Sequence, residues 1–148
     1  MSSLTLGQSN TIINAALKKA REMKFAPLAV VVLDASGDLI AAQREDGASM
    51  FRVDVATGKA WASIGMDAPS RILAERAAGN PNFFVALAAT GQGRFLPQPG
   101  AVLIRDANGR IIGAAGASGG TGDEDEAACI AGVLAAGLVS EPAKPSLP

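Results

Sequence analysis

Residues 34–42 read DASGDLIAA, and residues 106–114 repeat this phrase as DANGRIIGA. Each copy follows an apolar run, at residues 28–33 and 101–104. A Ser-Gly or Asn-Gly pair between two apolar segments is typical of a β-hairpin, because Gly and Asn adopt positive φ at low cost. Each copy therefore predicts a strand, a tight turn and a second strand, and two such hairpins predict a mostly antiparallel sheet.

Helical spacing of apolar residues flanks the two predicted hairpins. Thr5 and Gln8 form a capping-box pattern, and apolar residues recur at helical spacing from there to Met23. Residues 83–87 are apolar but fit no single element. Further helices are predicted over about 50–66, 69–77 and 123–139, and a Gly- and Pro-rich loop over 90–100. This order predicts an α+β fold, with one antiparallel sheet and helices around it.

Size and composition limit the classes of protein to which the chain can belong. Its 148 residues, 49% of them apolar, predict one globular domain over residues 1–148 with a flexible Pro-rich tail over 141–148. The 13 basic residues form no stripe and aromatic residues make up only 4%, so we expect no nucleic-acid partner. Without an apparent secretion signal or a run of about 18 apolar residues, we expect a cytoplasmic protein with no membrane partner.

The chain contains no histidine, which removes the usual zinc sites, Ser-His and Cys-His nucleophile pairs, and a His-ligated haem. Cys129 is the only cysteine, so no intrachain disulfide can form, and we expect it to be a small core residue. The acidic run at residues 123–126 lacks the spacing of an EF-hand. Thr121 and Glu124 form a capping box, so this run predicts a helix start and no metal site.

A glycine-rich junction at residues 116–122 is the first candidate binding site. It separates a predicted strand from a predicted helix, and such a junction presents backbone N–H groups and the positive end of the helix dipole to an anion. It matches neither a Walker loop nor the GxGxxG pattern. The alternative is a turn whose glycines allow close backbone packing.

Arg44, Asp46 and Lys59 form the second candidate site. Arg44 can bind a carboxylate with two hydrogen bonds, Asp46 can transfer a proton, and a desolvated Lys59 can act as a base or form an imine. The alternative is a solvated surface cluster. Gly58 beside Lys59 costs a helix about 1 kcal/mol relative to Ala, so we expect another backbone to come close there.

Several of these motifs, taken in order, resemble those of one known family. They are REDGA at residues 44–48, ATGKA at 56–60 and IGAAGASG at 112–119, followed by Asp125-Glu126 and an Ala-rich helix. From about Leu4 to Val139 the chain resembles the GlcG/HbpS family, haem-degrading-domain-like proteins that also supply the C-terminal part of PduO-type proteins. The resemblance implies a profilin-like fold, with a central antiparallel sheet of about five strands flanked by helices, and assembly into homo-oligomers.

The resemblance does not imply one activity. Some members bind haem or a corrinoid, and others belong to organic-acid or aromatic catabolism. The lack of histidine departs from a His-ligated tetrapyrrole, and Pro99-Gly100-Ala101-Val102 stands where the family usually has Gly-Gly-x-Pro. The family pattern adds weight to Arg44, Asp46, Lys59 and Ser118, which occupy recurring motif positions.

Together these observations predict a pocket between residues 44–48, the Lys59 helix and residues 116–120. It would bind a small anionic organic substrate without cofactor or metal, as a cofactor-free enzyme or accessory of organic-acid or aromatic catabolism. The reaction would be a proton-transfer, lyase, isomerase or hydrolytic step. The predicted catalytic residues are Lys59, Asp46 and Arg44, and the predicted ligand-binding residues are Glu45, Phe83, Phe84, Phe95, Gly116, Ser118 and Gly119. The alternatives are a haem- or corrinoid-binding protein without His ligation and a purely structural oligomer.

Overall fold

The computed structural model describes residues 3–147 and confirms the α+β class. Along the chain the elements are α1 (Leu6–Glu22), β1 (Ala29–Asp34), β2 (Leu39–Arg44), α2 (Phe51–Met66), α3 (Ser70–Gly79), α4 (Pro81–Thr90), β3 (Ala101–Arg105), β4 (Ile111–Ser118), α5 (Gly122–Ala135) and β5 (Val139–Glu141). Both predicted capping boxes are present, at Thr5 and at Thr121. Local sequence chemistry therefore sets where α1 and α5 begin.

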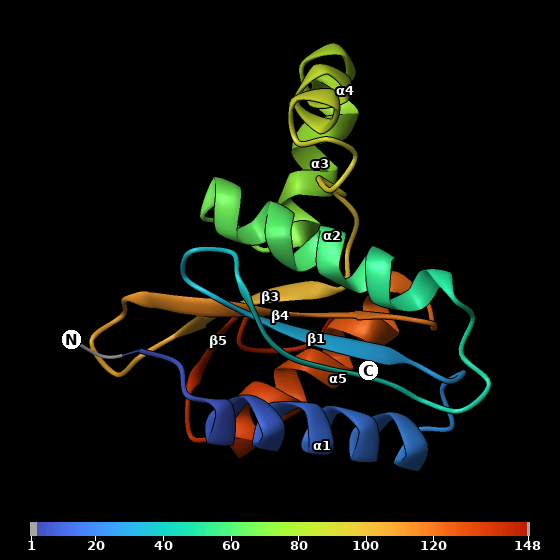
Figure 1. Ribbon diagram of the computed structural model, residues 1–148, viewed down its shortest axis with the longest axis vertical. Coiled ribbons are helices and arrows are strands. Elements are labelled where there is room, and N and C mark those ends of the chain that lie inside the picture. Colours follow the sequence, from blue (N-terminus) through green and yellow to red (C-terminus); the bar gives the residue numbers. More distant parts are fainter. Residues whose placement is uncertain (1–2, 148) are drawn as a thin grey trace.

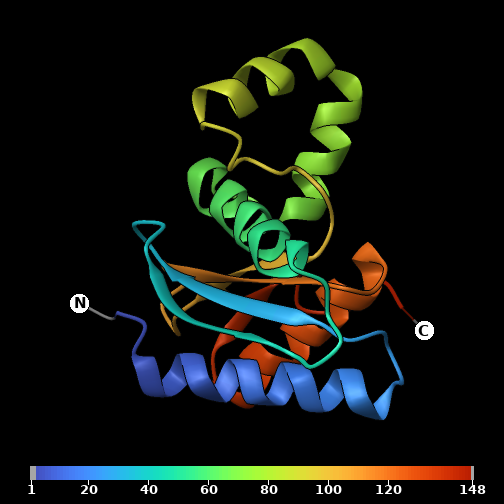
Figure 2. The same cartoon turned by 45° about the vertical axis from the view of Figure 1, so that its right-hand side comes forward.

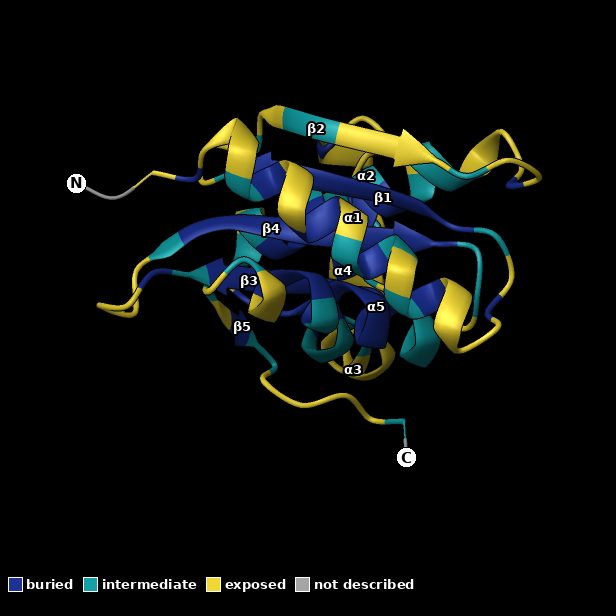
Figure 3. Ribbon diagram, turned by 90° about the horizontal axis from the view of Figure 1, so that it is seen from below, coloured by how far each residue is buried: buried dark blue, intermediate teal, exposed yellow. Residues whose placement is uncertain are grey.

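One antiparallel sheet, in the order β2-β1-β4-β3-β5, forms the centre of the molecule. The two hairpins meet where β1 pairs with β4, with Ala29 opposite Ser118. Helices α1 and α5 cover one face and α2 covers the other (Figure 1). Val30 and Val32 pack on the α1–α5 side, and Val31 and Leu33 on the α2 side. Strand β1 is buried on both faces, whereas the edge strand β2 and the outer side of α1 are exposed (Figure 3).

The two repeated phrases form hairpin turns of the same geometry. Asp34 Oδ1 accepts hydrogen bonds from the backbone of Ser36 and Asp38, and Asp106 Oδ1 accepts the equivalent pair from Asn108 and Arg110. Gly37 and Gly109 have φ of 83° and 82°. Each is the last residue of its turn, and its N–H donates to the backbone oxygen of Asp34 or Asp106, respectively. Each loop therefore has three residues with glycine in the left-handed position. The register of each hairpin also shifts further into the strands, between Val32 and Leu33 and between Ile104 and Arg105.

Residues 67–97, here called the arm, follow α2, form α3 and α4 and lead back towards β3. The arm projects from the body of the molecule beyond α2 (Figures 1 and 2). The unassigned segment 83–87 lies in α4, where Phe84 packs on Phe95 with ring centroids 5.9 Å apart. Phe83 and Val85 on the same helix are 49% and 71% exposed. Nothing in the local pattern separates a short uncharged helix of this kind from a strand.

The C-terminal prediction is wrong at two points. Helix α5 ends at Ala135 because Gly137 adopts a φ of 74°, a common way for helices to stop. The chain then forms β5, which pairs with β3, and Glu141 makes an ion pair with Arg105. Glu141, expected at the start of the flexible tail, is therefore part of the sheet. No helix among residues 3–147 has the length and apolarity needed to cross a membrane.

Candidate functional site

A cavity of about 390 Å³ lies where α2, the end of β4, the start of α5 and the loop before β3 meet. It is lined by Arg52, Val55, Lys59, Leu96, Gln98, Pro99, Ser118, Gly120, Thr121, Gly122, Asp123 and Asp125. Lys59 and part of the glycine-rich junction, Ser118 and Gly120 to Gly122, share one cavity, whereas Gly116, Gly119 and residues 44–48 of the predicted pocket do not line it. The cavity walls come from three segments that are far apart in the sequence, within residues 52–59, 96–99 and 118–125.

Lys59 is a buried cation in the wall of this cavity. Lys59 is only 5% exposed. Its Nζ donates to Asp125 Oδ2 at 3.1 Å and to the backbone oxygen of Ala117 at 3.0 Å. Asp125 Oδ1 in turn accepts from the backbone N–H of Gly120 at 2.9 Å. An ammonium group has three N–H donors, and residues 3–147 supply acceptors for two of them. The third donor has no acceptor among these residues.

Two glycines make room for Lys59 and its helix. A Cβ on Gly100, which has a φ of +135°, would lie 2.6 Å from Lys59 Nζ. A Cβ on Gly58 would lie 2.8 Å from the backbone oxygen of Arg94. The expectation that another backbone approaches Gly58 is thus confirmed, and that backbone belongs to the returning end of the arm.

Arg52 is the cation at this cavity without a carboxylate partner among the described residues. Nη1 donates to Ser118 Oγ at 2.9 Å and Nε donates to Ser49 Oγ at 3.2 Å, and both acceptors are neutral hydroxyls. None of the ion pairs formed within residues 3–147 includes Arg52. Because Arg52 precedes Lys59 by seven residues, two helical turns place both on one face of α2.

Each residue of the acidic run has a partner, and two of them share one. Asp125 binds Lys59, Glu124 completes the capping box with Thr121, and Arg71 of α3 binds both Asp123 and Glu126. Hydrogen bonds to Glu126 first and Asp123 second raise the pKa of Arg71 above its ordinary value, so it stays charged. No group of three or more metal-binding side chains occurs within residues 3–147. Ion pairing and capping account for this run.

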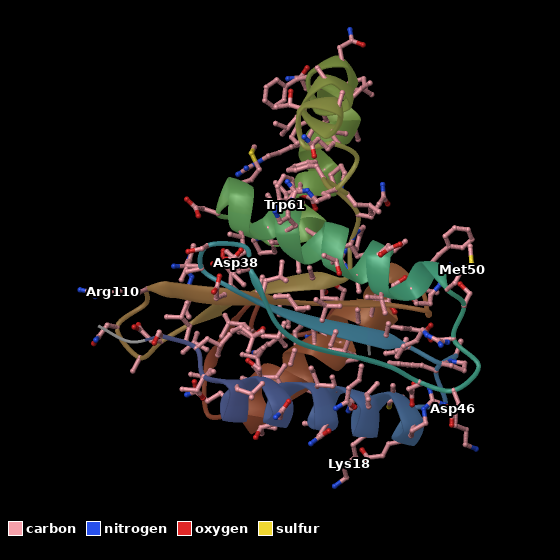
Figure 4. All side chains as sticks on the ribbon, in the orientation of Figure 1. Lys18, Asp38, Asp46, Met50, Trp61 and Arg110 are labelled. Atoms are coloured by element: carbon pink, nitrogen blue, oxygen red, sulfur yellow. The ribbon has the colours of Figure 1, made fainter. Side chains whose placement is uncertain are left out.

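The structure does not bring Arg44, Glu45 and Asp46 to Lys59. They line a second cavity of about 450 Å³ beside the end of α1, together with Arg21. Arg44 Nη1 donates to the backbone oxygen of Ala48, and Glu45 binds Arg21 and the Leu28 N–H. Figure 4 shows Asp46 on the loop that follows β2, far from the arm. The prediction of one pocket that includes residues 44–48 is wrong, because this loop turns away around the edge of the sheet.

The predicted ligand-binding residues outside this cavity have other surroundings. Phe84 and Phe95 are buried in the core of the arm, and Phe83 lies exposed on α4. Gly116 faces α2, where a Cβ would lie 2.3 Å from the backbone oxygen of Ala56. A Cβ on Gly119 would lie 2.1 Å from the oxygen of Pro27. Close backbone packing, the alternative for the glycine run, therefore accounts for these two glycines, and Ser118 lines the cavity as predicted.

Sequence reasoning missed Arg52 and Asp125 as site residues. The i, i+7 spacing of Arg52 and Lys59 was a usable signal, since it predicts a shared helix face. No signal of this kind existed for Asp125, because any of four consecutive acids could have faced Lys59. The packing of α5 made that choice.

Cys129 is a core residue, as expected. It is fully buried, with Sγ 3.7 Å from the Gly100 oxygen, and burial together with the charge of Asp125 raises the pKa of the thiol above its ordinary value. We expect no reaction with a disulfide reagent such as DTNB at pH 8 in the native protein, and rapid reaction in 6 M guanidinium, about the strength that unfolds most domains. Fast labelling of the Cys129 thiol in the native protein, monitored by absorbance at neutral and mildly alkaline pH, would contradict this burial.

Comparison with known proteins gives relatives over nearly the whole chain. The family model described as haem degrading protein HbpS-like matches residues 4–134. The crystal structure of HbpS is 27% identical with a TM-score of 0.78, and 90% of each chain is covered. The crystal structure of Klebsiella pneumoniae protein ORFY is 25% identical with a TM-score of 0.83, covering 93% of this chain and 92% of that one.

The fold also matches that of the PduOC–haem complex. Its TM-score is 0.80 at 23% identity, with 90% of this chain and 95% of that chain covered, so this likeness concerns the fold. Among curated proteins, none matches the sequence significantly. The family model spans the α1 capping box, both hairpins, the Lys59 helix, the arm and nearly all of α5. The chain therefore belongs to the HbpS-like family of haem degrading proteins.

Proposed function

We propose that this chain binds a small monocarboxylic acid in the cavity between α2 and α5. The observation that carries the proposal is that the Arg52 guanidinium in the cavity wall makes no ion pair within residues 3–147. Lys59 pairs with Asp125, and Asp123 and Glu126 share Arg71, so Arg52 meets only the hydroxyls of Ser49 and Ser118 among these residues. A guanidinium held by two neutral hydroxyls favours one carboxylate, which it can bind through two hydrogen bonds.

The remaining wall suits a ligand with an apolar body. Val55, Leu96 and Pro99 supply apolar surface, and Gln98 and Thr121 supply polar groups that can orient the ligand. A volume of about 390 Å³ is at the small end of ligand pockets. A small acid of a few to about ten heavy atoms fits this range better than a large cofactor.

If this protein catalyses a reaction on the bound acid, Lys59 is the group that transfers a proton. Its free N–H donor and its buried position next to Asp125 suit donation to an oxygen of a substrate whose carboxylate rests on Arg52. A lyase, isomerase or hydrolytic step without cofactor would follow this pattern. Asp46, in the other cavity, has no part in the proposed step.

Isothermal titration with acetate, butyrate and benzoate tests the binding proposal, with butyramide as the neutral match and succinate as the dianion. We expect a monocarboxylate to bind, butyramide not to bind, and Arg52→Gln to weaken binding about 10- to 100-fold, because a hydrogen bond to a charged group contributes about 1.5–3 kcal/mol. The matched control is Arg44→Gln, which should leave binding unchanged. Binding that depends on Arg44 and not on Arg52 would overturn the proposal.

Haem or corrinoid binding is the second candidate, favoured by the family description and by the likeness to the PduOC–haem complex. The donor set does not fit a ligated tetrapyrrole, because no His, Cys or Met is among the described residues that line the two large cavities. Lys59 is engaged by Asp125, and Cys129 is fully buried. Titration with haemin separates the two: a saturable shift of the visible absorbance band favours this candidate, and no shift favours the acid.

Self-association is a further part of the proposal, supported by the exposed Phe83 and Val85 on α4. A native mass spectrum would give the subunit number. An added mass that releases a small acid would also identify the bound molecule, whereas an added mass equal to that of haem would support the second candidate.

A further inference from the structure

Arg71 connects the base of the arm to the first turn of α5 without lining the cavity. Nε donates to Glu126 Oε2 at 2.9 Å, and Nη2 pairs with Asp123 Oδ1. The two acids are three residues apart and so lie on one side of the helix. Asp125, between them in the sequence, points instead to Lys59.

Glu126 depends on this arginine. Its side chain is completely buried, and its second carboxylate oxygen has no hydrogen-bond partner within residues 3–147. Arg71 is thus the cation that compensates a buried charge, and loss of such a partner is strongly destabilising. This contact explains why the arm is tied to α5.

Asp123 has a different relation to Arg71. Its side chain is 45% exposed and lines the cavity, so its charge acts on whatever the cavity binds. Arg71, which is not among the lining residues, offsets that charge by pairing with Asp123. Without Arg71, the net charge around the cavity would fall by one, next to the backbone amides of the α5 start.

We infer that Arg71 is a positioning residue that keeps the cavity selective for anions, by neutralising Asp123 and by holding the α5 turn that presents Asp125 to Lys59. This inference rests on the proposed function. It separates two roles for one side chain: the Glu126 contact supports the fold, and the Asp123 contact sets the charge that a carboxylate ligand meets.

Double substitutions separate the two roles. Arg71→Met is expected to lower the melting temperature and to weaken acetate, butyrate or benzoate binding about tenfold, by charge repulsion across a partly solvated site. Adding Glu126→Gln should recover the melting temperature but not the affinity. Adding Asp123→Asn should recover the affinity, and Asp123→Asn alone should bind the carboxylate more tightly than the wild type. Arg71→Lys should retain most of the binding.

If Arg71→Met does not fold, the binding affinities are compared in proteins that also carry Glu126→Gln. There, the pair Arg71→Met/Glu126→Gln and the triple variant with Asp123→Asn differ only in the charge of Asp123. Equal affinities in these two proteins would overturn the inference, as would wild-type affinity in a folded Arg71→Met. A wild type that binds none of the three carboxylates would instead overturn the proposed function.

Discussion

Asp125→Ala is expected to lower the free energy of unfolding by about 3–5 kcal/mol, because it leaves the Lys59 ammonium buried without its counter-charge. The two side chains are only 2% and 7% exposed, and their atoms lie 3.1 Å apart. Asp125 also accepts the Gly120 N–H, so the same change frees a backbone donor at the cavity. Urea unfolding followed by far-UV circular dichroism measures the effect.

The matched control is Glu141→Ala, which breaks an ion pair between Arg105 and Glu141. That pair is 28% and 42% exposed, and we expect a loss of about 0–1 kcal/mol. The double variant Lys59→Met/Asp125→Leu should be more stable than Asp125→Ala, because no buried charge is left unpaired. Equal losses for Asp125→Ala and Glu141→Ala would contradict the burial of the Lys59–Asp125 pair.

Gly119→Ala is expected to destabilise the fold by about 2–6 kcal/mol, the sum of overpacking and backbone strain of about 1–3 kcal/mol each. Its φ is +147°, and a Cβ would lie 2.1 Å from the Pro27 oxygen and 3.0 Å from Leu28 Cα. Both contacts are backbone atoms of the two residues just before β1, which cannot move aside as a flexible side chain can. Thermal unfolding of the purified variant gives the measurement.

Two other glycines separate these contributions. Gly93 has a positive φ of +79°, and no described atom lies within 4 Å of the Cβ that alanine would add. Gly93→Ala therefore measures backbone strain alone. Gly116 has no positive φ, but the Cβ that alanine would add lies 2.3 Å from the backbone oxygen of Ala56. Gly116→Ala therefore measures steric overlap alone. We expect each to cost less than Gly119→Ala. A Gly119→Ala protein as stable as the wild type would show that this glycine has some role other than packing.

The hairpins, the helix caps and the class of fold were predictable because their causes are local. Asp34 and Asp106 recur with a glycine three residues later, and each carboxylate closes its own turn. Helix α4 and strand β5 were not predictable in this way. Helix α4 has no charged face, so its sequence shows no helical alternation of polar and apolar residues. Strand β5 forms because β3 has an open edge with which a short segment can pair.

The candidate site was predicted in part. Lys59 and Ser118 line the cavity, but the arginine beside them is Arg52, and Arg44 lies around the edge of the sheet. Arg44 belongs to the REDGA motif, whereas Arg52 was marked only by its seven-residue spacing from Lys59 on one helix. The path of residues 45–50 decides which guanidinium reaches the end of β4.

The sequence by itself determined the two hairpins, the helix starts and the absence of any histidine ligand, since each depends on residues that are neighbours in the chain or on composition alone. Only the tertiary structure decided which of four acids binds Lys59, that Asp123 and Glu126 share Arg71, and that Arg52 makes no ion pair in the described part of the chain. The physical reason is that charge pairing acts over a few ångströms in space. The distances between these side chains are set by how α2, α3 and α5 pack, across more than 50 residues of sequence.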